Sequence, residues 1–158
     1  MSQTDKLLKI HLLLPLIWMA IIFIFSQQPA SIFSGQSSVF VEQLHHIVPS
    51  IDQQLLTFII RKSAHIFAYF ILGILIFNAL WRINFSKLTS GWPAISSVII
   101  CTLYAASDEF HQLFVSDRSG EIRDIIIDSI AASIGIVLIS YIYKYSKVAA
   151  RKPSSHPQ

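Results

Sequence analysis

The chain has 158 residues, of which 53% are hydrophobic and only 13% are charged, with a formal net charge of +3. A soluble domain carries about 25% charged residues, so the composition excludes an ordinary water-soluble globule and indicates that lipid covers much of the surface. It also disfavours nucleic-acid binding, because the basic residues do not gather on one amphipathic face. Cys101 is the single cysteine, which excludes an intramolecular disulfide.

Four apolar stretches are candidates for membrane crossing, which requires about 20 mostly apolar residues in a helix. We therefore predict an all-α fold, a polytopic bundle of four transmembrane helices in a single domain over residues 1–158, with a core at 10–145 and a basic cytoplasmic tail at 146–158. The first stretch follows lysines, as a signal peptide would, but no clear small-x-small cleavage site comes after it, so we expect a retained helix. The four stretches are residues 11–26, 63–81, 92–107 and 125–143.

The lysines and arginines are divided unequally between the two sides of the predicted bundle. Eight lie at the N-terminus, after the second stretch or in the tail, and four lie on the other side. Because cytoplasmic loops carry the excess of basic residues, we predict a multi-pass protein with both termini in the cytoplasm. The four residues on the outer side are Arg61, Lys62, Arg118 and Arg123.

The connection between the first two stretches carries two amphipathic patterns. Its first half places Phe40 and Leu44 on one helical face, and its second half begins with Ser50 and Gln53 at the spacing of a capping box. Pro49 separates the two halves. We therefore predict two short helices at the outer membrane interface; the alternative is a partly ordered loop.

Charged residues are concentrated in residues 104–133, which hold eight of the 21 in the chain. A lone carboxylate at the bilayer centre costs about 2.5–3.5 kcal/mol, so several together are best explained if they face cations. We predict one converging polar pocket near the outer leaflet; the alternative is a salt-bridge network that pins the hairpin between the third and fourth stretches. The polar groups that share a helical face or a helix end are Lys62, His65 and Tyr69, then Asp108, Glu109 and Gln112, then Asp124 and Asp128, with Arg118 and Arg123 as further cations.

Small residues and a turn pattern accompany these polar groups. Gly73 continues the face of the second stretch that carries the polar residues, while Ala131 and Gly135 continue that of the fourth. Small residues let helices approach closely, so we expect these two faces to be in contact. The segment "SDRSG" predicts a type I turn with Asp117 at its start and Gly120 at its end.

Three segments carry a resemblance to a known family. "RKSAHIFAYFILG" (61–73) is similar to the K-x-x-H-x-x-x-Y-x-x-L-G segment of the VanZ-like family, and "DEFHQLFVSDRSGEIRDIIIDSIAASIG" (108–135) resembles its D-E-x-x-Q, R and D-x-x-x-N-x-x-G elements. "FSQQP" (25–29) resembles the family's exit from its first helix. Asp128 stands where the family commonly has Asn, and Ala131 where it commonly has Gly.

The resemblance implies a small protein of the bacterial cytoplasmic (inner) membrane. The founding member of the family is associated with low-level resistance to teicoplanin, which implies a role in the sensitivity of the cell envelope to lipophilic glycopeptides. The positions that match the family's pattern are Lys62, His65, Tyr69, Gly73, Asp108, Glu109, Gln112, Arg118 and Asp124.

The first function hypothesis is a non-enzymatic membrane factor whose outward-facing polar pocket binds an amphiphile or an envelope component. Its expected partners are membrane lipids and a lipid-linked envelope component or amphiphilic antibiotic, with no nucleic acid. The candidate ligand-binding residues are Lys62, His65, Tyr69, Asp108, Glu109, Gln112, Arg118, Asp124 and Asp128.

The alternative is an intramembrane acid–base hydrolase or transferase that acts on a lipid-linked or acylated envelope substrate. Glu109 or Asp124 would be the general base, His65 an acid and Arg118 an anion clamp. A metal version of this enzyme would use His65, Asp108, Glu109 and Asp124 as nitrogen and oxygen ligands, but the sequence has no H-E-x-x-H pattern or cysteine pair, so we predict no metal. The sequence also has no G-x-S-x-G elbow or Gly-rich phosphate loop, and we predict no cofactor. A proton-coupled carrier is disfavoured because no inverted repeat is visible.

Overall fold

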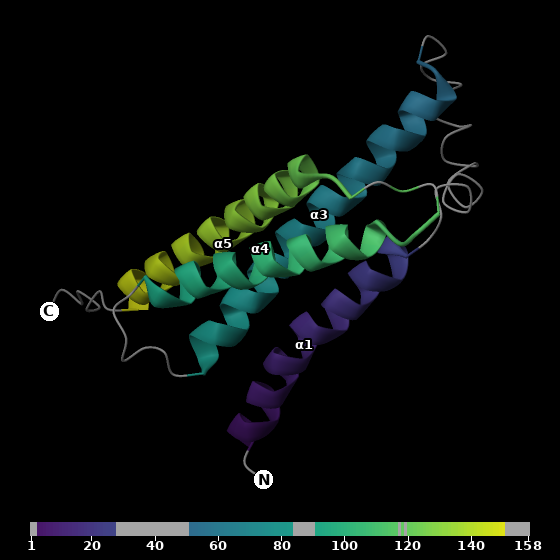
Figure 1. Ribbon diagram of the computed structural model, residues 1–158. Coiled ribbons are helices and arrows are strands. Elements are labelled where there is room, and N and C mark those ends of the chain that lie inside the picture. The colour runs from purple at the N-terminus through teal and green to yellow at the C-terminus, as the bar shows by residue number, and fades with distance from the viewer. Residues whose placement is uncertain (1–2, 28–50, 84–90, 117, 119, 151–158) are drawn as a thin grey trace, which may run out of the picture.

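A computed structural model describes residues 3–27, 51–83, 91–116, 118 and 120–150 (Figure 1). These residues form four helices and no β-strand, which confirms the all-α class. The helices are α1 (Gln3–Ser26), α3 (Gln53–Arg82), α4 (Trp92–Gln112) and α5 (Ile122–Ala150).

The helices alternate in direction along the chain (Figure 1). α1 and α4 run toward one end of the bundle, and α3 and α5 run away from it. As a result, the last turn of α1, the first turns of α3 and α5 and the last turn of α4 all lie toward that end. The polar segment between α4 and α5 is therefore positioned close to the beginning of α3.

The second predicted interfacial helix is not shown as a separate element, because Gln53 and the residues after it form the first turns of α3. Asp52 caps this helix by accepting a hydrogen bond from the Gln54 backbone N–H at 3.1 Å. No proline or glycine interrupts the 30-residue helix until Gly73, so α3 continues without a break from its first turns into the apolar stretch that is predicted to cross the membrane. The first predicted interfacial helix and its flanking residues Pro49 and Ser50 lie outside the described residues, as does Asp117 of the predicted turn.

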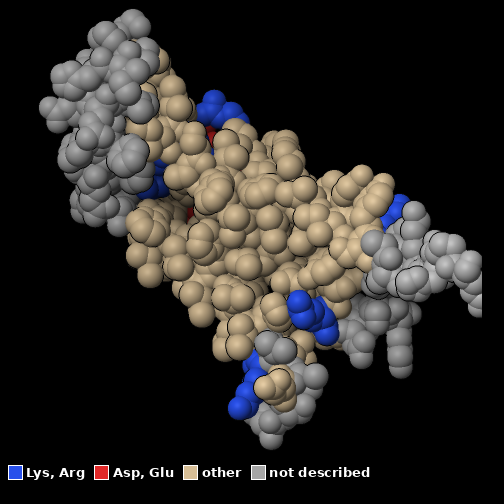
Figure 2. All heavy atoms as spheres, turned by 180° about the vertical axis from the view of Figure 1, so that it is seen from behind, with Lys and Arg blue, Asp and Glu red and all other residues tan. Residues whose placement is uncertain are grey.

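Three of the helices are long and apolar enough to cross a membrane: Leu8–Ser26, Gln53–Arg82 and Ile122–Ser146. α4 does not belong to this group, because serine and threonine residues dilute its apolar surface and Asp108 and Glu109 occupy its last turns. A crossing by α4 thus stays a prediction. Figure 2 shows a broad uncharged surface on the described part of one face, with lysines and arginines toward the two ends.

α3 and α5 make the tightest contact in the bundle. A Cβ atom on Gly73 would overlap the carbonyl oxygen of Ala132, and one on Gly135 would overlap the carbonyl oxygen of Phe70. The predicted contact between the small-residue faces is thus present. The buried core around it consists of Ile22, Tyr69, Leu72, Ile76, Phe77, Cys101, Ala105, Ala131, Ala132 and Ile136.

Hydrogen bonds attach α1 to the other helices. The Trp18 indole N–H donates to the carbonyl oxygen of Ala68 on α3 at 2.9 Å. The Tyr104 hydroxyl of α4 donates to the carbonyl oxygen of Met19 at 2.6 Å. α1 is therefore an integral member of the bundle in this structure.

Candidate polar ligand site

A small cavity, here called the polar cavity, lies where α3, α5 and the segment after α4 meet. Its volume is about 70 Å³. Seven of the nine predicted ligand-binding residues line it. The described residues that line it are Phe58, Arg61, Lys62, His65, Glu109, Gln112, Arg118, Glu121, Asp124, Ile127 and Asp128.

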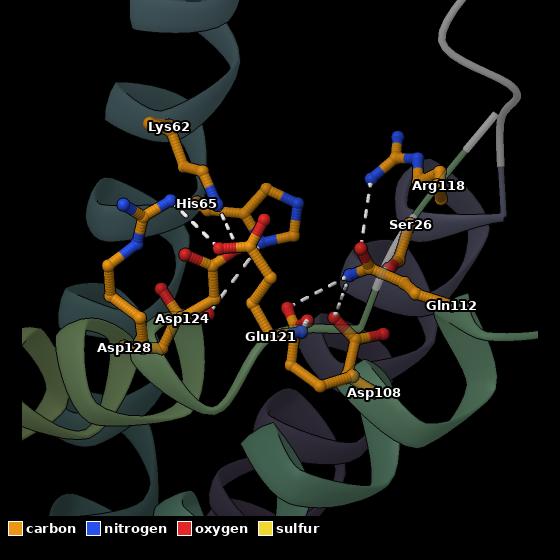
Figure 3. Close-up of polar contacts among 11 residues, drawn as sticks. Ser26, Lys62, His65, Asp108, Gln112, Arg118, Glu121, Asp124 and Asp128 are labelled. Atoms are coloured by element: carbon orange, nitrogen blue, oxygen red, sulfur yellow. Dashed lines mark hydrogen bonds and ion pairs between the residues drawn. The ribbon is translucent and has the colours of Figure 1, made fainter.

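Two cation–carboxylate contacts form the wall between α3 and α5. The Lys62 ammonium group forms an ion pair with the Asp124 carboxylate. One turn further along both helices, His65 Nδ1 lies 3.9 Å from Asp128 Oδ2. Figure 3 shows Lys62 and His65 on α3 facing these two aspartates on α5. The close approach of the two helix backbones makes such short contacts between spans possible.

Gln112 organises the α4 side of the site. Its amide nitrogen Nε2 lies 2.9 Å from Ser26 Oγ, 3.3 Å from Asp108 Oδ2 and 3.2 Å from Glu109 Oε1. Its carbonyl oxygen accepts from Arg118 Nη1 at 3.5 Å (Figure 3). One buried amide thereby connects α1, α4 and the segment that follows α4.

The segment after α4 folds back against that helix. A Cβ atom on Gly120 would overlap the Glu109 carbonyl oxygen, so only glycine permits this approach without a shift. The next residue, Glu121, donates its backbone N–H to Glu109 Oε2 at 2.9 Å. These contacts bring Arg118 and Glu121 to the cavity wall.

Two predicted site residues do not line the polar cavity. Tyr69 is fully buried, with its ring centroid 6.4 Å from that of His65 and 6.0 Å from that of Tyr104. Asp108 is buried beside Gln112. Both therefore contact residues that line the cavity, Tyr69 through His65 and Asp108 through Gln112. Arg123, predicted as a cation for the pocket, instead pairs with Glu121 at 2.8 Å in an exposed position.

The polar cavity is lined by both basic and acidic residues, and one buried acceptor atom in its lining residues lacks a hydrogen-bond partner among the described residues. Asp124 is 7% exposed, and its Oδ1 has no hydrogen-bond partner among the described residues. Buried carboxylate oxygens are normally satisfied, so this atom is suited to accept from a bound molecule. The basic lining residues are Arg61, Lys62 and Arg118, and the acidic ones are Glu109, Glu121, Asp124 and Asp128.

Arg118 keeps its charge in this environment. Burial lowers the pKa of its guanidinium group, and Arg61 lowers this pKa further, whereas the carboxylates of Asp108 and Glu109 raise it. A guanidinium group starts from so high a pKa that it stays protonated at neutral pH. A fixed cation at the cavity can therefore attract an anionic group.

Sequence reasoning missed three polar residues that contribute to the site, in addition to the apolar lining residues Phe58 and Ile127. Arg61 lines the cavity one helical turn before His65, so the i, i+4 spacing could have included it. Glu121 lies in the charged segment but matches no family element. Ser26 contacts Gln112, which is 86 residues away in the chain, and no local spacing indicates that contact. Within the described part of the chain, no three His, Cys, Asp or Glu side chains form a group that could hold a metal ion.

Three apolar helices of membrane-crossing length, with buried carboxylates and cations gathered at one end, are typical of a helical membrane protein. The VanZ/LLP1 family model matches residues 11–143, and the chain belongs to this family. The resemblance in the sequence is thus confirmed. Neither the curated proteins nor the solved structures contain a match to the chain.

Proposed function

We propose that this protein binds the polar head of a membrane amphiphile in the polar cavity, at the outer leaflet of the bacterial cytoplasmic membrane. The observation that carries the proposal is the Asp124 carboxylate in the wall of a cavity that also contains cations, with an Oδ1 that is buried and has no hydrogen-bond partner among the described residues. The basic-residue count in the sequence supports an outer location for the site, with both termini in the cytoplasm.

The size of the cavity restricts what it can hold. A volume of about 70 Å³ accommodates only a few water-sized groups, far less than a glycopeptide. A phosphate, an amine or a short polyol fits this limit better than a whole antibiotic molecule. Any effect on sensitivity to teicoplanin would therefore be indirect, through the lipid or lipid-linked envelope component that the site binds.

One observation favours a second candidate, acid–base catalysis on a lipid-linked or acylated substrate. Asp128 Oδ2 lies 3.9 Å from His65 Nδ1, so a small shift would bring this carboxylate within hydrogen-bond distance of an imidazole that could transfer protons. Glu109 could then act as the base and Arg118 as the anion clamp. Among the residues that the structure describes, the cavity lining contains no serine, threonine, cysteine or tyrosine, so a nucleophile from this group would be a carboxylate or a bound water. Binding requires fewer additional groups and is the function we prefer.

A lipid-retention experiment tests the proposal. The purified protein is stripped with detergent, and native mass spectrometry measures the amphiphile that remains bound to the wild type, Asp124→Asn and Lys144→Gln. Lys144 lies exposed near the opposite end of α5, so its variant is a control for the loss of a charged side chain away from the polar cavity. We expect the wild type and Lys144→Gln to retain a bound amphiphile and Asp124→Asn to lose it. Equal retention by all three proteins would contradict the proposal.

A further inference from the structure

A second cavity, here called the apolar groove, lies between α1 and α3. Its volume is about 310 Å³. Three residues, Arg61, His65 and Arg118, line both the apolar groove and the polar cavity, so the two are neighbours. The rest of the groove is formed by Trp18, Ile21, Ile22, Phe25, Ala64, Phe67 and Ala68.

The groove is amphipathic along its length. Among its described lining residues, Arg61 and Arg118 are the charged ones, and both are basic. From Arg61 to Ala68, α3 rises by about 10 Å, and over that distance the wall changes from cationic to apolar. The hydrogen bond from Trp18 to the Ala68 carbonyl lies at the apolar end and joins the two helices there. This arrangement matches an anionic head followed by a hydrocarbon chain.

We propose that the groove holds one acyl chain of a phospholipid, whose phosphate lies between Arg61 and Arg118 and whose head-group hydroxyl or ammonium donates to Asp124 in the polar cavity. The inference rests on the proposed function and names its ligand class. Guanidinium groups match the geometry of phosphate oxygens. A free fatty acid has an acyl chain and an anionic carboxylate. It has no head group with an N–H or O–H donor that could reach Asp124 Oδ1.

The selectivity of the site among phospholipids must come from its contacts with the lipid head group. An acyl chain gains little by leaving the bilayer for a protein groove, because lipid tails are as apolar as the groove wall. The two arginines select phosphate, and the unpartnered acceptor on Asp124 selects a head group with an N–H or O–H donor. Phosphatidylglycerol and phosphatidylethanolamine have such donors, whereas phosphatidylcholine has none.

Photo-cross-linking in nanodiscs tests the inference. Phosphatidylglycerol, phosphatidylethanolamine and phosphatidylcholine analogues, each with the same diazirine-bearing acyl chain, are irradiated with the full-length protein, and the adducts are mapped by mass spectrometry. We expect the first two lipids to label the groove residues of α1 and α3 about tenfold more than phosphatidylcholine, as expected for one charge-assisted hydrogen bond. Arg61→Gln should reduce this labelling by a similar factor.

Ala64→Trp provides a variant that acts on the groove alone, because Ala64 lines the groove and not the polar cavity. It should abolish groove labelling while the protein still folds, as judged by its thermal unfolding. Labelling that is equal for all three lipids, or adducts outside the groove, would overturn the inference. A photoreactive residue at position 67 that cross-links to residues 28–50 of the same chain instead of lipid would also overturn it.

The two proposals fail in different ways. If the acyl chain lies elsewhere, groove labelling is absent but Asp124→Asn still loses its bound amphiphile in the retention experiment. If the polar cavity binds no head group, Asp124→Asn retains as much amphiphile as the wild type, and any groove labelling is the same for the three head groups.

Discussion

Lys62 of α3 and Asp124 of α5 form an ion pair across the interface of two helices, although 62 positions separate them in the sequence. The pair lies on the wall of the polar cavity, one turn away from the contact between His65 and Asp128. It therefore serves both the packing of α3 on α5 and the charge balance of the site.

The ion pair predicts an asymmetric response to mutation. The Lys62 side chain is 23% exposed and that of Asp124 is 10% exposed, so a lysine without its partner can reach water more easily than an aspartate can. Lys62→Gln should lower the free energy of unfolding by about 2–4 kcal/mol, because it leaves a buried carboxylate without its cation. Asp124→Asn should cost less, and the double variant should recover part of the loss. Thermal unfolding in detergent measures all three; equal and additive losses would contradict the pairing.

The contact between α3 and α5 predicts that two glycines cannot be replaced. Gly73→Ala and Gly135→Ala each place a methyl group against a backbone carbonyl oxygen that cannot move aside easily. We expect each to destabilise the protein by about 1–3 kcal/mol, as overpacking does. Gly91→Ala is the matched control, because a Cβ atom at Gly91 meets nothing within 4 Å. Membrane abundance and thermal unfolding provide the measurement, and a similar tolerance at all three positions would contradict the close approach.

Substitutions of the carboxylates test whether the polar cavity binds a ligand or only stabilises the fold. Asp128 stands where the family commonly has Asn, so Asp128→Asn should keep expression and lipid retention. Asp124→Asn and Glu109→Gln should keep expression but lose retention, because each removes a charge from the polar cavity. Membrane levels are measured for each variant. If retention follows abundance across the three variants, the carboxylates only stabilise the hairpin between α4 and α5.

The predicted orientation can be tested by labelling. In a Cys101→Ala background, single cysteines are introduced at Ser119 and Ser154, and intact spheroplasts or protoplasts receive an impermeant maleimide. The excess of basic residues at the termini predicts labelling at position 119 and not at 154. Labelling at 154 alone would reverse the orientation and place the polar cavity in the inner leaflet.

Helix periodicity accounts for what the sequence could predict. The spacing of Lys62 and His65, and of Asp124 and Asp128, correctly places each pair on one helical face. The small residues around Gly73 and Gly135 correctly indicate a close helix contact. Each of these patterns concerns one face of one helix, so it can be recognised from residues that are near one another in the chain.

The remainder of the site depends on which helices are neighbours, and spacing alone does not contain that information. Ser26 reaches Gln112 from another helix, and the apolar groove exists only because α1 packs beside α3. The continuity of α3 was also missed, because a capping-box pattern at Ser50 suggested a separate helix. Asp52 caps α3, and no break follows it.

The most direct test of the central claim is a high-resolution density map of the protein purified with its native lipids. We predict non-protein density in the polar cavity within hydrogen-bond distance of Asp124 Oδ1, flanked by Arg61 and Arg118. Density for ordered water alone in that cavity, in a preparation that retains lipid elsewhere on the protein, would contradict the account.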